Sequence, residues 1–303
     1  MKKVVFDCDN TMGITRCDVD DGLALLYVMG SAEELDLLSI CTSYGNNTIQ
    51  AVDINMRSFA RRFGLHAPIF KGASRSESPI SEASRALVRT VRAFPHEVTI
   101  IATGSLTNLL GAWREEPQFF ELAERIVVMG GITSSLIFPG KIMDELNLSC
   151  DVDAVYQLLL AAQRGAKVTF ITGNSCLDAF FTKDDIHESF AGEDALNRWV
   201  TRACDDWIAH LSREFKTDGF CCWDVLCPVF VTHPELFCEE KAKVALNKKL
   251  LSVGFLDIVD NKRLTPEGEN QVADVTFVHM KDAADVVRHI NNTWKKQSSR
   301  TSY

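Results

Sequence analysis

The sequence has no excess of basic residues. Its 32 lysines and arginines are outnumbered by 41 aspartates and glutamates, which gives a formal net charge of −9 at pH 7. A protein that binds a nucleic acid polymer needs a basic surface to displace the counterions of the phosphate backbone. No apolar run approaches the roughly 18 residues that a membrane-spanning helix requires. We therefore expect neither a nucleic acid polymer nor a membrane as a partner.

Two further absences concern the cellular compartment and the domain organisation. The N-terminus turns acidic at Asp7, too early for a secretory signal peptide, and the ten cysteines form no pair of C-x-x-C motifs. Ten cysteines without a signal peptide indicate free thiols in a reducing, cytoplasmic environment. The chain has no linker rich in proline, glycine and serine, and no internal repeat. We expect one domain over residues 1–294 and a polar, frayed tail over 295–303.

The chain does contain several short apolar runs that end in small or polar residues. Such runs are typical of buried parallel strands, and they lie at residues 3–6, 37–41, 98–102, 125–129 and 167–171. Helical patterns occupy residues 22–29, 49–63, 82–93, 106–114, 152–163, 184–211 and 279–294, while the type of 220–232 stays open. This alternation predicts an α/β fold with a mainly parallel central sheet and helices on both faces. Ligands bind such sheets beyond the carboxyl ends of the strands.

An acidic cluster follows the first predicted strand. Five carboxylates lie within fifteen residues, and they belong to Asp7, Asp9, Asp18, Asp20 and Asp21. Hard cations such as Ca²⁺ and Mg²⁺ are held by oxygen ligands of this kind. The alternative interpretation treats the last three as capping and first-turn acids of the following helix.

Taken alone, the first motif permits a different enzyme class. The segment Phe6-Asp7-Cys8-Asp9-Asn10-Thr11 resembles the D-x-D-x-T signature of haloacid dehalogenase-like phosphatases. In that interpretation Asp7 is the phosphoryl-accepting nucleophile and Asp9 the general acid, with Mg²⁺ between them.

The remaining motifs favour another family. Asp20-Asp21 is followed by Gly45-Asn46, by T-G-S-L-T-N at 103–108, by M-G-G at 129–131, by E-L-N at 145–147 and by W-D at 223–224. In this order, and over roughly residues 1–235, the set resembles the nucleoside hydrolases of the inosine-uridine-preferring superfamily. The resemblance implies Ca²⁺-dependent hydrolysis of the N-glycosidic bond of a ribonucleoside to ribose and free base. It also implies a homodimer or homotetramer.

The resemblance assigns roles to individual residues. It implies that Ca²⁺ is held by Asp9, Asp21, Asp224 and the backbone carbonyl of Thr103, with Asp7 behind them. Asp9 is then also the general base that takes a proton from the metal-bound water. The substrate-binding residues implied are Asp20, Asn46, Met129, Glu145, Asn147 and Trp223.

Some features depart from the family pattern. Ten residues, rather than three, separate Asp9 from Asp20, and the H-G-x-x-G-L segment expected before residue 98 is absent. These departures keep open a nucleoside- or ribose-binding protein without turnover. Tryptophan rather than histidine precedes Asp224, as in the purine-preferring branch, where an indole stacks on the base. The alternative interpretation is that Trp223 packs in the hydrophobic core and does not contact the base. We also expect Trp207, His210 and Phe215 to help close the base pocket.

Overall fold

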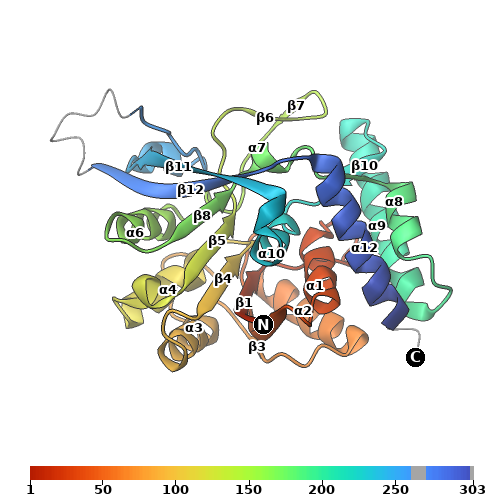
Figure 1. The fold of residues 1–303 in the computed structure, drawn as a ribbon, viewed down its shortest axis with the longest axis horizontal. Helices are drawn as coiled ribbons and strands as arrows, with labels where there is room; N and C mark the ends of the chain where they lie inside the picture. Colours follow the sequence, from red (N-terminus) through yellow and green to blue (C-terminus); the bar gives the residue numbers. More distant parts are fainter. Residues whose placement is uncertain (261–270, 301–303) are drawn as a thin grey trace.

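Eight strands form the central sheet of the computed structural model, which describes residues 1–260 and 271–300. The strand order is β11-β12-β8-β5-β4-β1-β2-β3, and only β11 pairs antiparallel to its neighbour (Figure 1). These strands are β1 (Lys2–Cys8), β2 (Leu35–Thr42), β3 (Ile69–Phe70), β4 (Val98–Ala102), β5 (Arg125–Met129), β8 (Val168–Ile171), β11 (Phe237–Ala245) and β12 (Val272–Met280). The predicted α/β fold with a mainly parallel sheet is confirmed.

Helices cover both faces of this sheet (Figure 1). One face packs against α1 (Asp20–Gly30), α2 (Ile49–Phe63), α8 (Lys183–Ser189), α9 (Ala195–Phe215), α10 (Leu226–Thr232) and α12 (Ala283–Arg300). The other packs against α3 (Glu82–Ala93), α4 (Thr107–Glu115), α5 (Phe119–Leu122), α6 (Val152–Gln163) and α11 (Lys248–Leu251). Successive strand residues alternate between the two cores: Val4 and Phe6 face the first, and Val5 faces the second. Both faces are therefore apolar, which explains the continuous hydrophobic runs.

Short elements occupy several of the connections between the larger helices and strands. They are the hairpin of β6 (Leu136–Phe138) and β7 (Lys141–Met143), the pair β9 (Phe180–Thr182) and β10 (Gly219–Cys221), the short helix α7 (Gly173–Cys176) and the 3₁₀ turn Pro234–Leu236. The segment 220–232, whose type the sequence leaves open, divides into β10, a turn and α10. Within the described residues, no helix is both long and apolar enough to cross a membrane.

Two helix predictions need correction. The stretch predicted as one helix over 184–211 is two helices, because α9 starts anew at Asp194, whose side chain accepts from the N–H groups of Leu196 and Asn197. The last helix starts at Ala283 and continues to Arg300, through residues 295–300 of the predicted tail. Ser298 is buried there and donates to Asn197 Oδ1 at 2.8 Å. Residues 301–303 lie outside the described part of the chain.

Candidate active site

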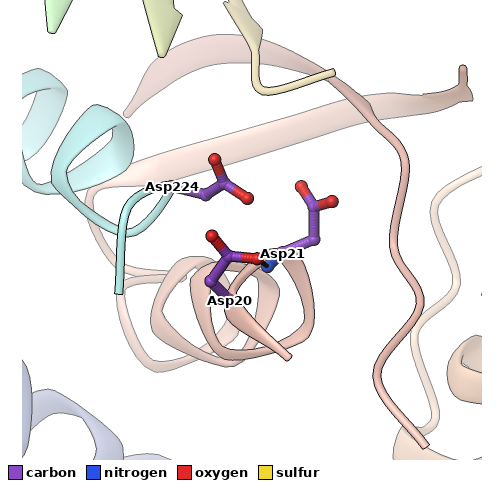
Figure 2. A group of neighbouring side chains, drawn as sticks. All are labelled: Asp20, Asp21 and Asp224. Carbon is purple, nitrogen blue, oxygen red and sulfur yellow. Dashed lines mark hydrogen bonds between the residues drawn. The ribbon is translucent and has the colours of Figure 1, made fainter. Parts of the chain in front are cut away.

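Three buried carboxylates meet at the edge of the sheet where the parallel strands end. Asp20 and Asp21 open α1, and Asp224 lies in the turn just before α10 (Figure 2). One ligand atom from each of the three lies within 4.8 Å of the others, and each residue is at most 4% exposed. The helix start explains the local placement of the first two, because first-turn acids are favoured by the helix dipole. That preference does not explain Asp224, which comes from a distant part of the chain.

Neighbouring strand ends supply polar groups around this cluster. The Thr103 hydroxyl, just past β4, donates to Asp21 Oδ1 at 2.7 Å. Asp9, just past β1, accepts two hydrogen bonds from Asn46: from its backbone N–H at 2.5 Å and from Nδ2 at 3.2 Å. Each contact joins a loop after one strand to a loop after another, as the parallel topology requires.

Asp7 lies behind the cluster within β1. Its Oδ1 accepts from Asn108 Nδ2 at 3.1 Å, and the residue is only 1% exposed. Desolvation by burial raises the pKa of Asp7 to about 8, partly opposed by the hydrogen bond from Asn108. Asp7 does not line the pocket described below, and the bond from Asn108 holds its side chain inside the protein.

The charges of the cluster are not balanced by the described part of the protein, so a bound cation would stabilise them. Burial is the main cause that raises the pKa of Asp9, Asp21 and Asp224, and repulsion among the carboxylates raises those of Asp21 and Asp224 further. Burial also raises the pKa of Asp20, to about 6. Within the described residues, no lysine, arginine or histidine forms an ion pair with any of them.

One buried oxygen atom of the cluster also favours a bound cation. Asp21 Oδ2 is buried and has no hydrogen-bond partner among the described residues. A buried carboxylate oxygen without a donor is costly unless a cation satisfies it. The donor set consists entirely of oxygens, which suits a hard cation such as Ca²⁺ or Mg²⁺. The residues present therefore fit a divalent metal ion.

A pocket opens beside the cluster and is lined by the predicted substrate-binding residues. All six of them line it, together with the two predicted metal-site residues Thr103 and Asp224. Asp9 and Asp21 are buried and are not among the lining residues. Asn46 therefore connects the pocket to Asp9, because it lines the pocket and donates a hydrogen bond to the Asp9 carboxylate.

Two of the lining residues are tied into the protein by their own hydrogen bonds. Asn147 Nδ2 donates to the carbonyls of Thr103 at 3.0 Å and Met129 at 3.1 Å. Glu145 accepts from the backbone N–H groups of Gly131, Leu148 and Ser149 at 2.8–3.0 Å. These bonds fix the loop after β5 against the loop before α6, which sets the floor of the pocket.

The sequence did not point to several other residues at this pocket. Leu136 and Met143, on opposite strands of the β6–β7 hairpin, line it, as do Asp18, Asp144, Leu146 and Gly173. Asp18 is the exception, because it is one of the five carboxylates of the predicted acidic cluster. No sequence pattern identified Leu136 and Met143 as pocket residues, because an apolar residue in a short strand looks the same in a core as in a pocket wall.

The residues expected to close the base pocket lie in two places. Phe215 has its ring 5.8 Å from that of Phe138, which in turn lies 6.0 Å from Trp223, so it belongs to the aromatic surroundings of the pocket. Trp207 and His210 stack on each other at 5.3 Å, and neither is among the lining residues. Trp207 instead faces the inserted loop around residues 13–17. The expectation for Trp207 and His210 is therefore wrong, because α9 turns Trp207 toward the insertion and His210 stacks on Trp207.

Comparison with known proteins identifies the class. The sequence matches the inosine-uridine preferring nucleoside hydrolase family over residues 4–293, so the chain belongs to this family of enzymes. Among curated relatives, it is 24% identical to the probable uridine nucleosidase 1 of Oryza sativa subsp. japonica, with 78% of this chain and 80% of the relative covered. It is 25% identical to the uridine nucleosidase 1 of Arabidopsis thaliana, with 78% and 77% covered.

Solved structures agree with the fold. A plant nucleoside hydrolase superimposes with a TM-score of 0.83 at 19% identity, with 98% of both chains covered. A purine-preferring ribonucleoside hydrolase from Gardnerella vaginalis gives a TM-score of 0.80 at 19% identity, with 99% of this chain and 98% of that chain covered. The family match over residues 4–293 argues against the phosphatase interpretation.

Proposed function

We propose that the protein hydrolyses the N-glycosidic bond of ribonucleosides and that it uses Ca²⁺ to do so. The observation that carries this proposal is the cluster of uncompensated, buried carboxylates beside a pocket lined by polar side chains. Hydrolysis breaks the bond between C1′ of the ribose and a nitrogen of the base. Water supplies the hydroxyl group to C1′, and the base departs with a proton, so that ribose and free base are formed.

In this proposal Asp9, Asp21, Asp224 and the Thr103 carbonyl hold the metal ion. Asp20 joins them as a candidate, since its carboxylate lies within the same group. The bound cation would neutralise the cluster and lower the pKa of a nearby water. Asp9 is the proposed general base that takes a proton from the attacking water. The two hydrogen bonds from Asn46 hold the carboxylate of Asp9 in one orientation for this task.

The remaining pocket residues would bind the ribose. We assign Asp20 and Asn46 to the 2′-hydroxyl side, Asn147 to the 3′-hydroxyl, Glu145 to the 5′-hydroxyl and Met129 to the underside of the ring. Their fixed hydrogen bonds orient them before the substrate arrives, which lowers the entropy cost of binding. Carboxylates around C1′ would also stabilise the positive charge that develops on the sugar as the bond breaks.

For the base we propose a purine preference, supported by the half-buried indole of Trp223 at the pocket wall. A purine presents a larger face for stacking than a pyrimidine does. A preference for uridine is the second candidate, and it is favoured by the two plant relatives, which are named as a probable uridine nucleosidase and a uridine nucleosidase. A cytoplasmic location and a homodimer or homotetramer complete the proposal. The location is supported by free cysteines throughout the described residues.

The test is a panel of inosine, adenosine, guanosine, uridine and cytidine, with release of reducing sugar as the readout. We expect turnover with Ca²⁺ and its loss with EDTA, restored by added Ca²⁺. Higher kcat/KM for the purine nucleosides supports Trp223 stacking, and higher kcat/KM for uridine selects the second candidate. Nucleoside binding by calorimetry without any product would instead indicate a binding protein without turnover.

A further inference from the structure

The outer wall of the pocket is built from two segments that are far apart in the sequence. The β6–β7 hairpin contributes Leu136 and Met143, which pair across its two strands and line the pocket. Trp223, from the turn before α10, lines the same pocket. The next pair toward the tip that shares this face of the hairpin is Phe138 and Lys141, because side chains alternate along a strand.

Phe138 contacts Trp223 without lining the pocket itself. Their ring centroids are 6.0 Å apart, and the planes meet at 64°, an edge-to-face arrangement. Phe138 is 6% exposed, whereas its neighbour Ile137, on the opposite face of the hairpin, is 54% exposed. The hairpin thus buries one aromatic side chain against the indole and leaves the adjacent apolar side chain in solvent.

Phe138 is itself held by other groups. Its ring lies 5.8 Å from that of Phe215 at the end of α9 and 6.3 Å from that of Phe180 in β9. Lys141 fastens the hairpin to the same helix end, because its amino group donates to the Glu214 carbonyl and lies 5.1 Å from the centre of the Phe215 ring. The contact with Trp223 is therefore one side of a larger aromatic cluster.

We infer that Phe138 is a positioning residue for base recognition, which holds the Trp223 indole at the angle in which its face meets the nucleobase. This inference rests on the proposed function and names the residue that prepares its base subsite. The indole is only half-buried, so without the ring of Phe138 the side chain would gain rotameric freedom on the wall of an open pocket. Binding a base would then require that freedom to be lost again. One aromatic edge contact corresponds to about two- to tenfold in an equilibrium constant.

The experiment is a double-mutant cycle on kcat/KM for inosine, with Phe138→Ala, Trp223→Ala and the double variant. We expect Phe138→Ala to lower kcat/KM by about fivefold to tenfold. If Phe138 acts through the indole, it should cause no further loss in the Trp223→Ala background. Phe138→Tyr should keep the wild-type value because it retains the ring. Ile137→Ala, the matched control one residue away, should keep it as well. The dissociation constant of free ribose should stay unchanged throughout.

Three results would overturn the inference. One is additive losses in the double variant, another is an equal loss of ribose binding in Phe138→Ala, and the third is wild-type kcat/KM in that variant. If Phe138→Ala does not fold, Phe138→Leu, which fills most of the volume without a ring, carries the same expectations. A wild-type enzyme that cleaves no nucleoside would overturn the proposed function alone. The same cycle measured on inosine binding by calorimetry would then decide the role of Phe138.

Discussion

The hydroxyl groups of Tyr27 and Thr232 lie 2.7 Å apart, and this hydrogen bond joins the far ends of α1 and α10. The opposite ends of the same two helices carry or adjoin the carboxylates of the acidic cluster, with Asp20 and Asp21 on α1 and Asp224 before α10. The bond therefore fixes the relative position of the two helices that bring the carboxylates together. Although this hydrogen bond lies far from the cluster, it contributes to the geometry of the site.

Replacing Tyr27 with phenylalanine removes this bond and keeps the ring. We expect a loss of about 1 kcal/mol in the free energy of unfolding, since both groups sit in a largely buried environment. For a chain of this size that corresponds to a fall in Tm of about 2–4 °C. The Ca²⁺ concentration that gives half-maximal activity should rise as well. Tyr156→Phe, on α6 at the other face of the sheet, is the control and should leave the Ca²⁺ response unchanged.

The hydroxyl of Tyr27 also lies 2.8 Å from Nε2 of His289. The pKa of His289 is lowered from 6.5 to about 4, mainly by burial and then by the charge of His233, whose ring lies 4.1 Å away. Glu235 opposes this shift, and a carboxylate oxygen of Glu34 lies 3.8 Å from Nδ1 of His233. The unfolded chain binds the proton first, so stability present above pH 6.5 is lost as the pH falls toward 4.

A pH series of thermal unfolding checks this. Because His289 is only half-buried, we expect a loss of about 1–2 kcal/mol between pH 7 and pH 4.5. His289→Gln has no titrating ring, so its Tm should fall less over this range than that of the wild type. Parallel curves for the two proteins would show that His289 does not contribute to the acid sensitivity.

The acidic cluster predicts opposite effects of one substitution with and without metal. The pKa values of Asp21 and Asp224 are raised in the folded protein, so their charged forms destabilise the metal-free fold at pH 7. Asp224→Asn removes one of these charges. In EDTA we expect the Tm of this variant to equal or exceed that of the wild type. In Ca²⁺ the wild type should gain about 2–3 kcal/mol at a hundredfold excess over Kd, and the variant should gain little.

Asp144→Asn is the matched control, because Asp144 lines the pocket but is exposed and lies outside the cluster. Its Tm should respond to Ca²⁺ as the wild type does. A Ca²⁺ response in Asp224→Asn equal to that of the wild type would show that the ion does not bind at the cluster.

The parts of the site that follow sheet strands could be predicted, because parallel topology brings the carboxyl ends of strands to one edge whatever their separation in the sequence. Asp9, Thr103 and Met129 meet for this reason. The contribution of the β6–β7 hairpin could not be predicted, since Leu136 and Met143 line the pocket in a hairpin whose tertiary contacts, such as those of Phe138 with Phe215 and Trp223, join segments far apart in the sequence. The acidic cluster that contains Asp20 and Asp21 was predicted, but the approach of Asp20 to Asp224 was not, because it depends on how α1 packs against the turn before α10.

The end of the last helix illustrates a different limit. Residues 295–300 are polar in composition, which suggests a frayed end, yet Gln297 and Ser298 are buried. The Cβ of Gln297 lies close to Gly30 at the end of α1, and Ser298 bonds to Asn197 of α9. A polar residue can complete a helix face when its partner is supplied by another helix, and composition alone does not reveal that partner.

The loop after β2 offers the sharpest test of the proposed general base. A Cβ atom added at Gly45 would lie 2.1 Å from Asp9 Oδ2, far inside contact distance. Gly45→Ala must therefore move either the carboxylate of Asp9 or the loop that carries Asn46, and it breaks the hydrogen bond from the Asn46 N–H in either case. Misplacement of a catalytic group by about 1 Å costs about a hundredfold in rate, so we expect kcat to fall by at least that factor.

Gly64→Ala separates this effect from the general cost of replacing a glycine. Gly64 has a positive φ of 65°, and nothing lies within 4 Å of an added Cβ, so the substitution strains the backbone without touching the site. We expect it to lower the free energy of unfolding by about 1–2 kcal/mol and to leave kcat near the wild-type value. Steady-state kinetics and thermal unfolding on both variants distinguish the two causes. If Gly45→Ala retained the kcat of Gly64→Ala, the position of the Asp9 carboxylate would not limit the reaction, and another residue would have to serve as the base.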